Sequence, residues 1–289
     1  MDRQPLTDRL GDRFLTEYGG ATAAYSLRAL NGNGDNVVRV RRSSDNFEQD
    51  FTASQVSDGT LESFCGVGDG FVETWYGQVP IVNSSNPTST GQPKIVSNGA
   101  LIEENGVAIP LWDGSNNTLR IAASDMATPT TQFQVSIVCK NNKSSMSSNE
   151  YLFGQYESTP DNRSFALYYR SNERLAVNFG DPSNGTFQGA WSNSSAISVD
   201  SLLVVGATYN AGTVKLYVNG VEVPSSLSAG TIPVSLFNTS SDYTIGSVLA
   251  SNSPAAVFDG KIGEIYFAKN LDDDITAIQQ AQMEAWGIS

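Results

Sequence analysis

Short apolar segments recur along the chain, and in many of them hydrophobic and polar positions alternate. Segments of about 4–8 residues with this pattern, rich in Val, Ile, Tyr and Phe, are typical of β-strands. Asn219-Gly220 separates two such segments, and this dipeptide between alternating apolar residues predicts a tight hairpin. The pattern predicts strands over 24–30, 37–42, 70–76, 133–139, 151–156, 164–169, 175–179, 201–209, 214–223, 243–246 and 260–268.

The spacing of these strands indicates the fold class. They recur at the short intervals of a β-sandwich, with turns rich in Gly, Asn and Ser between them. Of the 289 residues, 39% are hydrophobic and only 16% are charged, and Asn, Ser, Thr and Gly fill the difference. That composition suits turns and polar strand faces better than helices. We therefore expect an all-β protein, an antiparallel jelly-roll β-sandwich with a short helix at each end.

The first helix is predicted over residues 6–18. Thr7 is a suitable N-cap, Phe14 and Leu15 belong to an apolar stripe, and two glycines follow the segment. Two interpretations stay open: the stripe packs against the domain behind it, or it anchors the chain to a larger assembly. The second interpretation makes residues 1–20 an N-terminal helical docking segment.

The second helix is predicted over residues 272–286. Three consecutive aspartates at 272–274 provide an N-cap and favourable negative charge at the helix start. Ile275, Ile278 and Trp286 recur on one side of the helix, so we expect the tryptophan to pack on the sandwich.

The net charge of −13 narrows the range of partners. The 17 basic residues are spread thinly, whereas phosphate binding needs clustered Lys and Arg, so nucleic acid is not expected as a partner. Residues 1–15 lack an apolar core of signal-peptide length, and no apolar run is long enough to span a bilayer. We expect a chain that is synthesised in a cytoplasm and has no membrane span.

The absence of histidine limits the chemistry. The sequence has none, which excludes a Ser-His-Asp triad and a histidine-ligated zinc site, whereas a pair of carboxylates stays possible. The two cysteines, Cys65 and Cys139, do not have the spacing of metal ligands. We expect both to be free and buried; a disulfide between them is the less favoured alternative.

The second half of the chain resembles a known fold family. Residues 202–223 (LLVVGATYNAGTVKLYVNGVEV), 243–247 (YTIGS) and 258–270 (FDGKIGEIYFAKN), followed by a final helix, are similar to the laminin-G and concanavalin A-like lectin/glucanase pattern. The resemblance implies a sandwich domain over residues 131–289. It says little about function, because this fold is shared by lectins, hydrolases and adhesion modules.

The first half carries a second resemblance. Residues 23–30, 38–51, 68–76 and 92–96 are similar to the start of the α-L-arabinofuranosidase B catalytic domain. The resemblance implies that residues 21–130 form an arabinofuranosidase B-like β block within the same sandwich. Copies of this block occur in bacteriophage structural genes, joined to a concanavalin A-like sandwich, and this implies a virion protein.

The arabinofuranosidase resemblance implies a retaining hydrolase with two catalytic carboxylates, a nucleophile and a general acid. The segments that best match their positions are 164–167 and 245–248, and neither contains Asp or Glu. A vicinal cysteine pair is absent, and the family's Trp-Tyr-Asp-Gln is replaced by Trp-Tyr-Gly-Gln at 75–78. These departures predict that the chain is not an enzyme and that it has no catalytic residues.

Four aromatic residues are candidates for stacking on a sugar ring. Trp191 lies in a Gly-Ala-Trp-Ser-Asn-Ser segment that we expect to be a loop, and Tyr168 and Tyr169 end a predicted strand. Trp75 is a further candidate, although its strand pattern also suits a core position. No cofactor and no metal site is predicted.

Calcium is a weaker alternative to the absence of a metal site. It would need Asp69, Asp242 and Asp259 to converge, because Ca²⁺ takes about six or more oxygen ligands and no dense Asp/Asn loop is present.

Three hypotheses about function follow. The first is a non-catalytic phage virion protein of the tail, fibre or capsid, which contacts host-surface glycans or decorates the particle through its lectin-like sandwich. The second is a glycoside hydrolase that acts on arabinose-containing polysaccharide. The third is a structural virion subunit without a ligand. The first and third imply location in the virion, other virion proteins as partners and a homo-oligomer.

Overall fold

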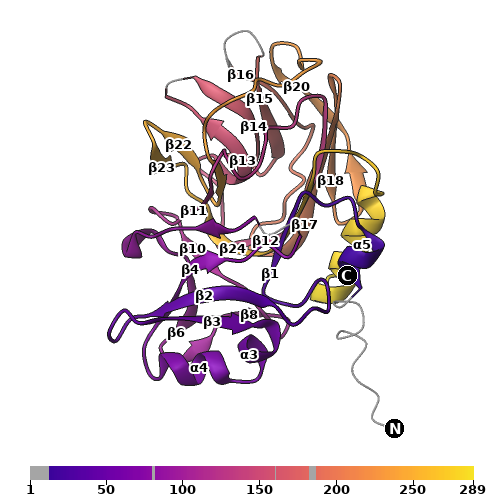
Figure 1. The fold of residues 1–289 in the computed structure, drawn as a ribbon. Helices are drawn as coiled ribbons and strands as arrows, with labels where there is room; N and C mark the ends of the chain where they lie inside the picture. Colours follow the sequence, from indigo (N-terminus) through magenta and orange to yellow (C-terminus); the bar gives the residue numbers. More distant parts are fainter. Residues whose placement is uncertain (1–12, 80–81, 160, 182–186) are drawn as a thin grey trace.

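The apolar segments fold into two facing layers of antiparallel strands, as a computed structural model of the chain shows (Figure 1). The structure describes residues 13–79, 82–159, 161–181 and 187–289. Strand β12 lies between β17 and β24 in the first layer, and the far edge of β24 pairs with β1 and β10. In order across the sheet, this layer comprises β19 (Val221–Val223), β18 (Thr213–Val218), β17 (Leu202–Asn210), β12 (Gln132–Asn141), β24 (Asp259–Ala268), and then β1 (Ala23–Ser26) and β10 (Leu111–Asp113).

The second layer lies opposite the first and carries the candidate site. Its strands pair in the order β20, β16, β15, β14, β13, β21 and β11, and a hairpin of β22 and β23 extends from β13. The strands are β20 (Ser225–Ala229), β16 (Phe187–Ser192), β15 (Leu175–Gly180), β14 (Asn162–Tyr169), β13 (Glu150–Glu157), β21 (Tyr243–Ile245), β11 (Leu119–Ile121), β22 (Val248–Ala250) and β23 (Ser253–Ala255).

The first part of the chain joins the two layers at one end of the sandwich, which is the lower end in Figure 1. Its strand β5 pairs with β11 of the second layer, and its strand β6 pairs with β10 of the first. The elements here are β2 (Asn36–Arg42), β3 (Glu48–Thr52), α3 (Ala53–Ser57), α4 (Thr60–Cys65), β4 (Gly70–Trp75), β5 (Ser84–Ser85), a 3-10 turn (Ser89–Gly91), β6 (Lys94–Ser97), β7 (Ala100–Leu101), β8 (Glu103–Glu104) and β9 (Val107–Ala108).

One hydrophobic core runs through both parts of the chain. The same buried cluster contains Trp75 from the first part and Phe133 and Phe267 from the sandwich. Its centre is aromatic: the rings of Phe133 and Phe165 stack with centroids 4.3 Å apart, and those of Phe165 and Phe267 stack at 5.6 Å. Because residues 21–130 supply strands to both layers and side chains to this core, they pack together with residues 131–289.

The all-β prediction is confirmed, and so is the Asn219-Gly220 hairpin. Both turn residues have positive φ, 49° and 76°, as a two-residue turn between twisted strands requires. Strands β16 and β20 were not predicted, because their sequences are rich in Gly, Ser and Ala and show weak alternation. Helix α3 was also missed, although Thr52 and Gln55 form a reciprocal capping box at its start.

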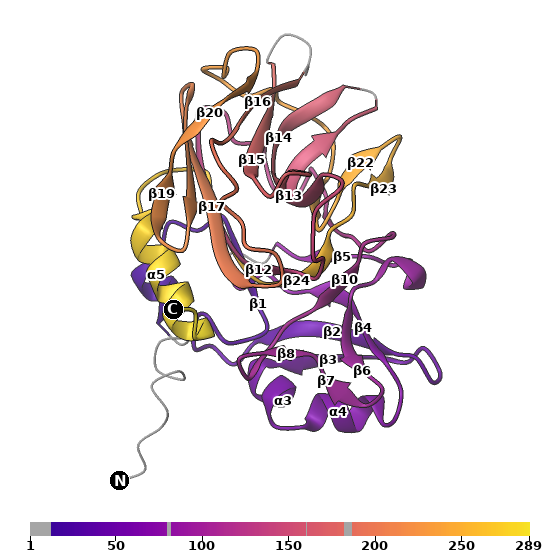
Figure 2. The ribbon, with the colours of Figure 1, turned by 180° about the vertical axis from the view of Figure 1, so that it is seen from behind.

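Two helices cover the outer face of the first layer (Figures 1 and 2). Helix α5 (Ile275–Trp286) begins at the N-cap Asp274, as predicted, and buries Trp286 completely. The tryptophan lies over Gly263 of β24, where a Cβ atom would be 2.4 Å from the indole ring. Helix α2 (Phe14–Glu17) packs its phenylalanine on Tyr266. No helix in the described ranges is long and apolar enough to cross a membrane.

The predicted N-terminal helix is therefore seen in part. Residues 1–12, with the proposed Thr7 cap, lie outside the described residues. Phe14 and Leu15 are buried against the sandwich, which favours the packing interpretation for this part of the segment. Docking of residues 1–20 to a larger assembly stays a prediction.

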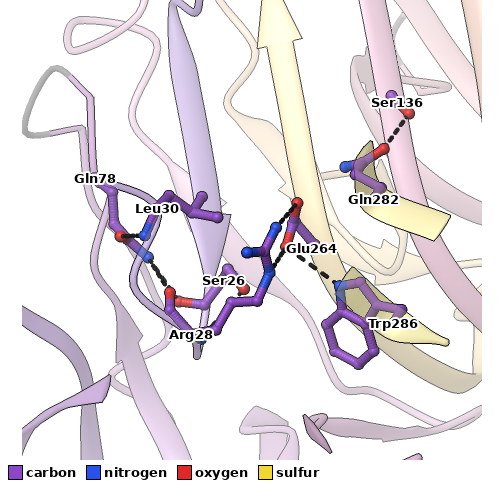
Figure 3. A network of polar contacts seen from close by, with 8 residues as sticks. All are labelled: Ser26, Arg28, Leu30, Gln78, Ser136, Glu264, Gln282 and Trp286. Atoms are coloured by element: carbon purple, nitrogen blue, oxygen red, sulfur yellow. Dashed lines mark hydrogen bonds and ion pairs between the residues drawn. The ribbon is translucent and has the colours of Figure 1, made fainter. Parts of the chain in front are cut away.

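A buried carboxylate ties both ends of the chain to the first layer (Figure 3). Glu264 is 0% exposed at the middle of β24, and its two oxygens accept hydrogen bonds from Nε and Nη2 of Arg28 at 2.7 and 3.0 Å. Trp286 Nε1 donates a third hydrogen bond at 3.2 Å. The loop that carries Arg28 is held by Gln78, whose amide nitrogen donates to the carbonyls of Ser26 and Arg28.

Substituting Glu264→Gln should lower the free energy of unfolding by about 3 kcal/mol, because the guanidinium of Arg28 would stay largely buried without a counter-charge. Glu222→Gln is the matched control, since it breaks an ion pair with Lys215 in which both side chains are about half exposed, and it should cost less than about 1 kcal/mol. Urea unfolding of both variants measures the difference. Equal losses would mean that Glu264 contributes no more than a surface pair.

Both cysteines are free and buried, as predicted. Cys139 lies in the aromatic core, with its sulfur 3.1 Å from the hydroxyl of Tyr169, and Cys65 ends helix α4. Burial raises the pKa of Cys65 to about 11 and that of Cys139 to about 12. Both thiols therefore stay protonated and weakly nucleophilic at neutral pH.

The folded protein should resist iodoacetamide at pH 8, because the pH lies well below both raised thiol pKa values and neither sulfur is accessible. In denaturant, both thiols should return to ordinary pKa values and both should be alkylated. Intact-mass measurement before and after denaturation reads out the two states. Alkylation of a folded, unheated sample would contradict the burial of that cysteine.

Candidate functional site

The outer face of the second layer carries a row of paired side chains. In an antiparallel pair, the side chains of two directly opposite residues point to the same side of the sheet. The strand register therefore places these residues on one face. The neighbouring residues Phe165, Leu167 and Val177 point the other way, into the core. Across the strands β13, β14, β15, β16 and β20, the row is Tyr151, Tyr168, Ala176, Trp191 and Ser226.

Small residues predominate in the neighbouring row on this face. The next row contains Gly154, Ala166, Asn178 and Gly189, of which only the asparagine has a long side chain. A Cβ atom on Gly189 would lie 2.6 Å from Ser228 Oγ and 2.9 Å from Asn178 Oδ1. Glycine at this position therefore leaves room for two polar groups from neighbouring strands.

Three tyrosines form a cluster on this face. The rings of Tyr151 and Tyr168 stack with centroids 4.6 Å apart and planes at 17°, and the ring centroid of Tyr156 lies 5.9 Å from that of Tyr151. Asn178 Nδ2 donates a 3.2 Å hydrogen bond to the hydroxyl of Tyr151. Burial raises the pKa of all three tyrosines, that of Tyr168 to about 12, so the hydroxyls stay neutral and able to donate.

A pocket of about 490 Å³ opens beside this cluster. It lies at the β22–β23 hairpin, whose strand β22 pairs with β13; Figure 2 shows the position of the hairpin beside β13. Aromatic and aliphatic groups form one part of its wall and hydroxyl, amide and ammonium groups the other. Such a mixed lining suits a ligand with apolar C–H faces and many hydroxyls, and the volume suits a small molecule or a short oligomer. The lining residues are Gly114, Ser115, Lys143, Ser148, Asn149, Tyr151, Tyr156, Ser158, Val248, Ala255, Ala256 and Val257.

Several buried polar atoms on this face make no hydrogen bond. Asn178 is only 3% exposed, yet its Oδ1 has no partner in the described part of the chain, and the same is true of Ser164 Oγ and Ser228 Oγ. A buried polar group without a partner costs about 1–3 kcal/mol. These are three of ten such atoms in the described residues, and a water molecule or a polar ligand on this face would satisfy them.

Comparison with models of protein families identifies the superfamily of this chain. A family model described as the concanavalin A-like lectin/glucanases superfamily matches residues 113–270, which is more than half of the chain. The chain belongs to the concanavalin A-like lectin/glucanase superfamily. A search of curated sequences gave no match.

Solved structures show how widely this fold is shared. An arabinofuranosidase complexed with arabinofuranosyl-α-1,2-xylobiose aligns with a TM-score of 0.66 at 13% identity, covering 96% of this chain and 65% of the other. A GH54 α-L-arabinofuranosidase soaked with a cyclic sulfate inhibitor gives 0.62 at 13%, covering 93% and 62%. The carbohydrate-binding module CBM40 of a Ruminococcus gnavus sialidase, bound to α2,3-sialyllactose, gives 0.42 at 15%, covering 52% and 83%.

These likenesses concern the fold. The chain spans less than two thirds of the length of either arabinofuranosidase chain. Their fold agrees with that of the present chain over its first part as well as its sandwich. At 13% identity they do not carry an activity to this superfamily member.

The structure separates the four predicted aromatic residues into two pairs. Trp75 and Tyr169 point into the core and are almost completely buried, so neither is available to a ligand, and these two predictions were wrong. Successive side chains of a strand point to opposite faces of the sheet, and these two residues occupy positions that point inward. Tyr168 and Trp191 do lie together on the outer face, Tyr168 buried in the tyrosine cluster and Trp191 half-buried beside it.

Trp191 belongs to β16 and not to a loop, which corrects the predicted setting. Tyr151, Tyr156 and Asn178 were missed as site residues. The period-two spacing of residues 164, 166 and 168 on β14 could have indicated a second, outer face, but the tyrosines of β13 fall on either side of bulges that break this period.

Two of the three aspartates suggested for calcium have other partners. Asp69 accepts hydrogen bonds from Lys94 Nζ at 2.7 Å and from the backbone of Asn98. Asp242 lies 4.0 Å from Arg120 and accepts from the backbone of Ala123. No group of three or more His, Cys, Asp or Glu in the described ranges is arranged to hold a metal ion.

Removing divalent cations should therefore leave stability unchanged. Dialysis against EDTA should shift the melting temperature by less than about 1 °C, because no bound ion would be lost from the native state. Differential scanning calorimetry with EDTA and with added CaCl₂ makes the comparison. A clear rise in melting temperature with calcium would show that oxygen ligands converge somewhere on the folded chain.

Proposed function

We propose that this chain is a non-catalytic glycan-binding domain whose site is the pocket beside Tyr151 and Tyr156. The observation that carries the proposal is the lining of that pocket. Tyr151 and Tyr156, which are 7% and 4% exposed, form an apolar part of the lining for sugar C–H groups together with Val248 and Ala255. Ser115, Ser158 and Asn149 supply hydrogen-bonding groups for hydroxyls. The superfamily to which the chain belongs is named after lectins and glucanases, and this supports a carbohydrate as the ligand.

The absence of Asp and Glu from the described lining of the pocket favours binding without hydrolysis. Glycoside hydrolysis needs two carboxyl groups about 5–9.5 Å apart across the scissile bond. None of the described residues that line the pocket is Asp or Glu. Glu150, at the start of β13, is buried and engaged by Lys143 and Asn141, so it serves as an ion-pair partner.

The wider setting remains a prediction from the sequence resemblance. A virion location, virion partners and a homo-oligomer would be consistent with a glycan-binding domain that contacts a host surface. The proposal for the pocket does not depend on them, because it concerns the ligand chemistry of one chain.

A substitution that fills the pocket tests the proposal. Ala255→Trp places an indole in the pocket from the edge of the hairpin, and Ser253→Trp places the same group on the same strand at an exposed position outside the pocket lining. On a glycan array, the wild-type chain and Ser253→Trp should bind the same glycans. Ala255→Trp should weaken that binding by about tenfold or more, because the ligand and the indole compete for the same volume.

A parallel assay separates binding from hydrolysis. Incubation with 4-nitrophenyl α-L-arabinofuranoside should release no nitrophenol above the rate without protein. Release that Ala255→Trp abolishes would replace the proposal with a hydrolase. Equal array binding by all three chains would mean that the ligand lies elsewhere on the sandwich.

A further inference from the structure

Two arginines flank Trp191 at the end of the outer face. The guanidinium carbon of Arg170 lies 3.5 Å from the centroid of the Trp191 ring, and that of Arg174 lies 5.9 Å from the same centroid. Both arginines belong to the turn between β14 and β15, where the backbone nitrogen of Arg170 donates to the carbonyl of Arg174. The turn adjoins the pocket, since Ser171 N donates to Asn149 Oδ1 and Asn149 lines the pocket wall.

Neither guanidinium has a counter-charge or a hydrogen-bond acceptor within the described part of the chain. Several other arginines have oxygen partners: Arg28 and Arg39 bind carboxylates through two nitrogens each, and Arg41 bonds to three oxygens. Acidic residues outnumber basic ones by 30 to 17, so carboxylate partners are common in this chain. Glu173 lies between the two arginines in the turn and makes no ion pair with either.

Stacking on Trp191 prepares Arg170 to bind an anion. A guanidinium that lies flat on an aromatic ring uses its π face for that contact and keeps its in-plane N–H donors free. Those donors form a fork that matches the paired oxygens of a carboxylate or a sulfate. The ring also restricts the arginine side chain before a ligand arrives, which lowers the entropy lost on binding.

We propose that Arg170 and Arg174, supported by Trp191, select glycans that carry an anionic group, a carboxylate or a sulfate. The proposal rests on the proposed function, because it assigns the charge of the ligand that the neighbouring pocket takes. The sugar ring and hydroxyls meet the tyrosine-lined pocket, and the anionic substituent meets the arginines across the Asn149–Ser171 contact. In a protein of net charge −13, an anionic ligand would otherwise be repelled, so a local pair of free cations decides which glycans bind.

Matched oligosaccharides that differ only in charge test this proposal. Oligogalacturonides and their methyl esters form the carboxylate arm, and sulfated carrageenan oligosaccharides and their desulfated forms make up the sulfate arm. Isothermal titration calorimetry should show binding to at least one anionic form about tenfold or more tighter than to its neutral counterpart. That preference should decrease as NaCl rises from about 50 to about 500 mM, since both arginines are partly exposed and their charges are screened.

Three variants separate the contributions. Arg170→Ala combined with Arg174→Ala should lower affinity for the anionic form to that for the neutral one and leave neutral binding unchanged. Arg170→Lys keeps the charge but loses the planar fork, so it should lose part of the preference. Lys215→Ala, on β18 of the other layer, removes one positive charge at an exposed ion pair and should leave the preference intact.

The outcomes distinguish this proposal from the one on which it rests. Equal binding of neutral and anionic forms, with Ala255→Trp still blocking both, would overturn the role of the arginines and leave the glycan-binding pocket standing. An anionic preference that survives the double arginine variant would place the cationic contact elsewhere and overturn the assignment. Absence of binding to any form, together with a glycan array without hits, would remove both proposals.

Discussion

The hydrogen-bonded ion pair between Glu264 and Arg28 is the constraint on which the arrangement of the chain depends. A carboxylate with no exposed surface is stable only when its lost hydration is replaced by close donors, and here three nitrogens supply them. Those donors come from a loop near the start of the chain and from the last turn of α5. Since Glu264 lies on β24, between β12 and β1, it links the Arg28 loop and helix α5 to the middle of the first layer.

The candidate site lies on the second layer, away from these contacts of Glu264. Helices α2 and α5 cover the outer face of the first layer (Figures 1 and 2), whereas the pocket adjoins β13 of the second layer, beside the β22–β23 hairpin. Gly154, Ala166 and Gly189 keep one row of this face small, and three tyrosines pack together beside it. The rigid aromatic core beneath it fixes the strands, so that the pocket and the arginine turn keep their relative positions.

Much of the fold could be predicted from local patterns. Alternation identified the long strands, Asn219-Gly220 identified the hairpin, and the three aspartates identified the start of α5, because each signal acts through neighbouring residues. Strand β16 was not predicted, because most of its residues are small or polar. Its pairing with β15 and β20 makes it a strand. The same dependence on tertiary pairing placed Trp191 in a sheet instead of a loop.

The amino-acid sequence by itself determined the fold class, the free cysteines and the lack of histidine chemistry, since these follow from composition and from short-range periodicity. Only the tertiary structure decided which aromatic side chains face outward. Tyr168 and Tyr169 are adjacent in sequence, yet one joins the outer cluster and the other the core, because neighbouring residues on a strand point to opposite faces and strand register selects the face. Likewise, Arg170 meets Trp191 only because β14, β15 and β16 pair in the order that brings two distant segments together.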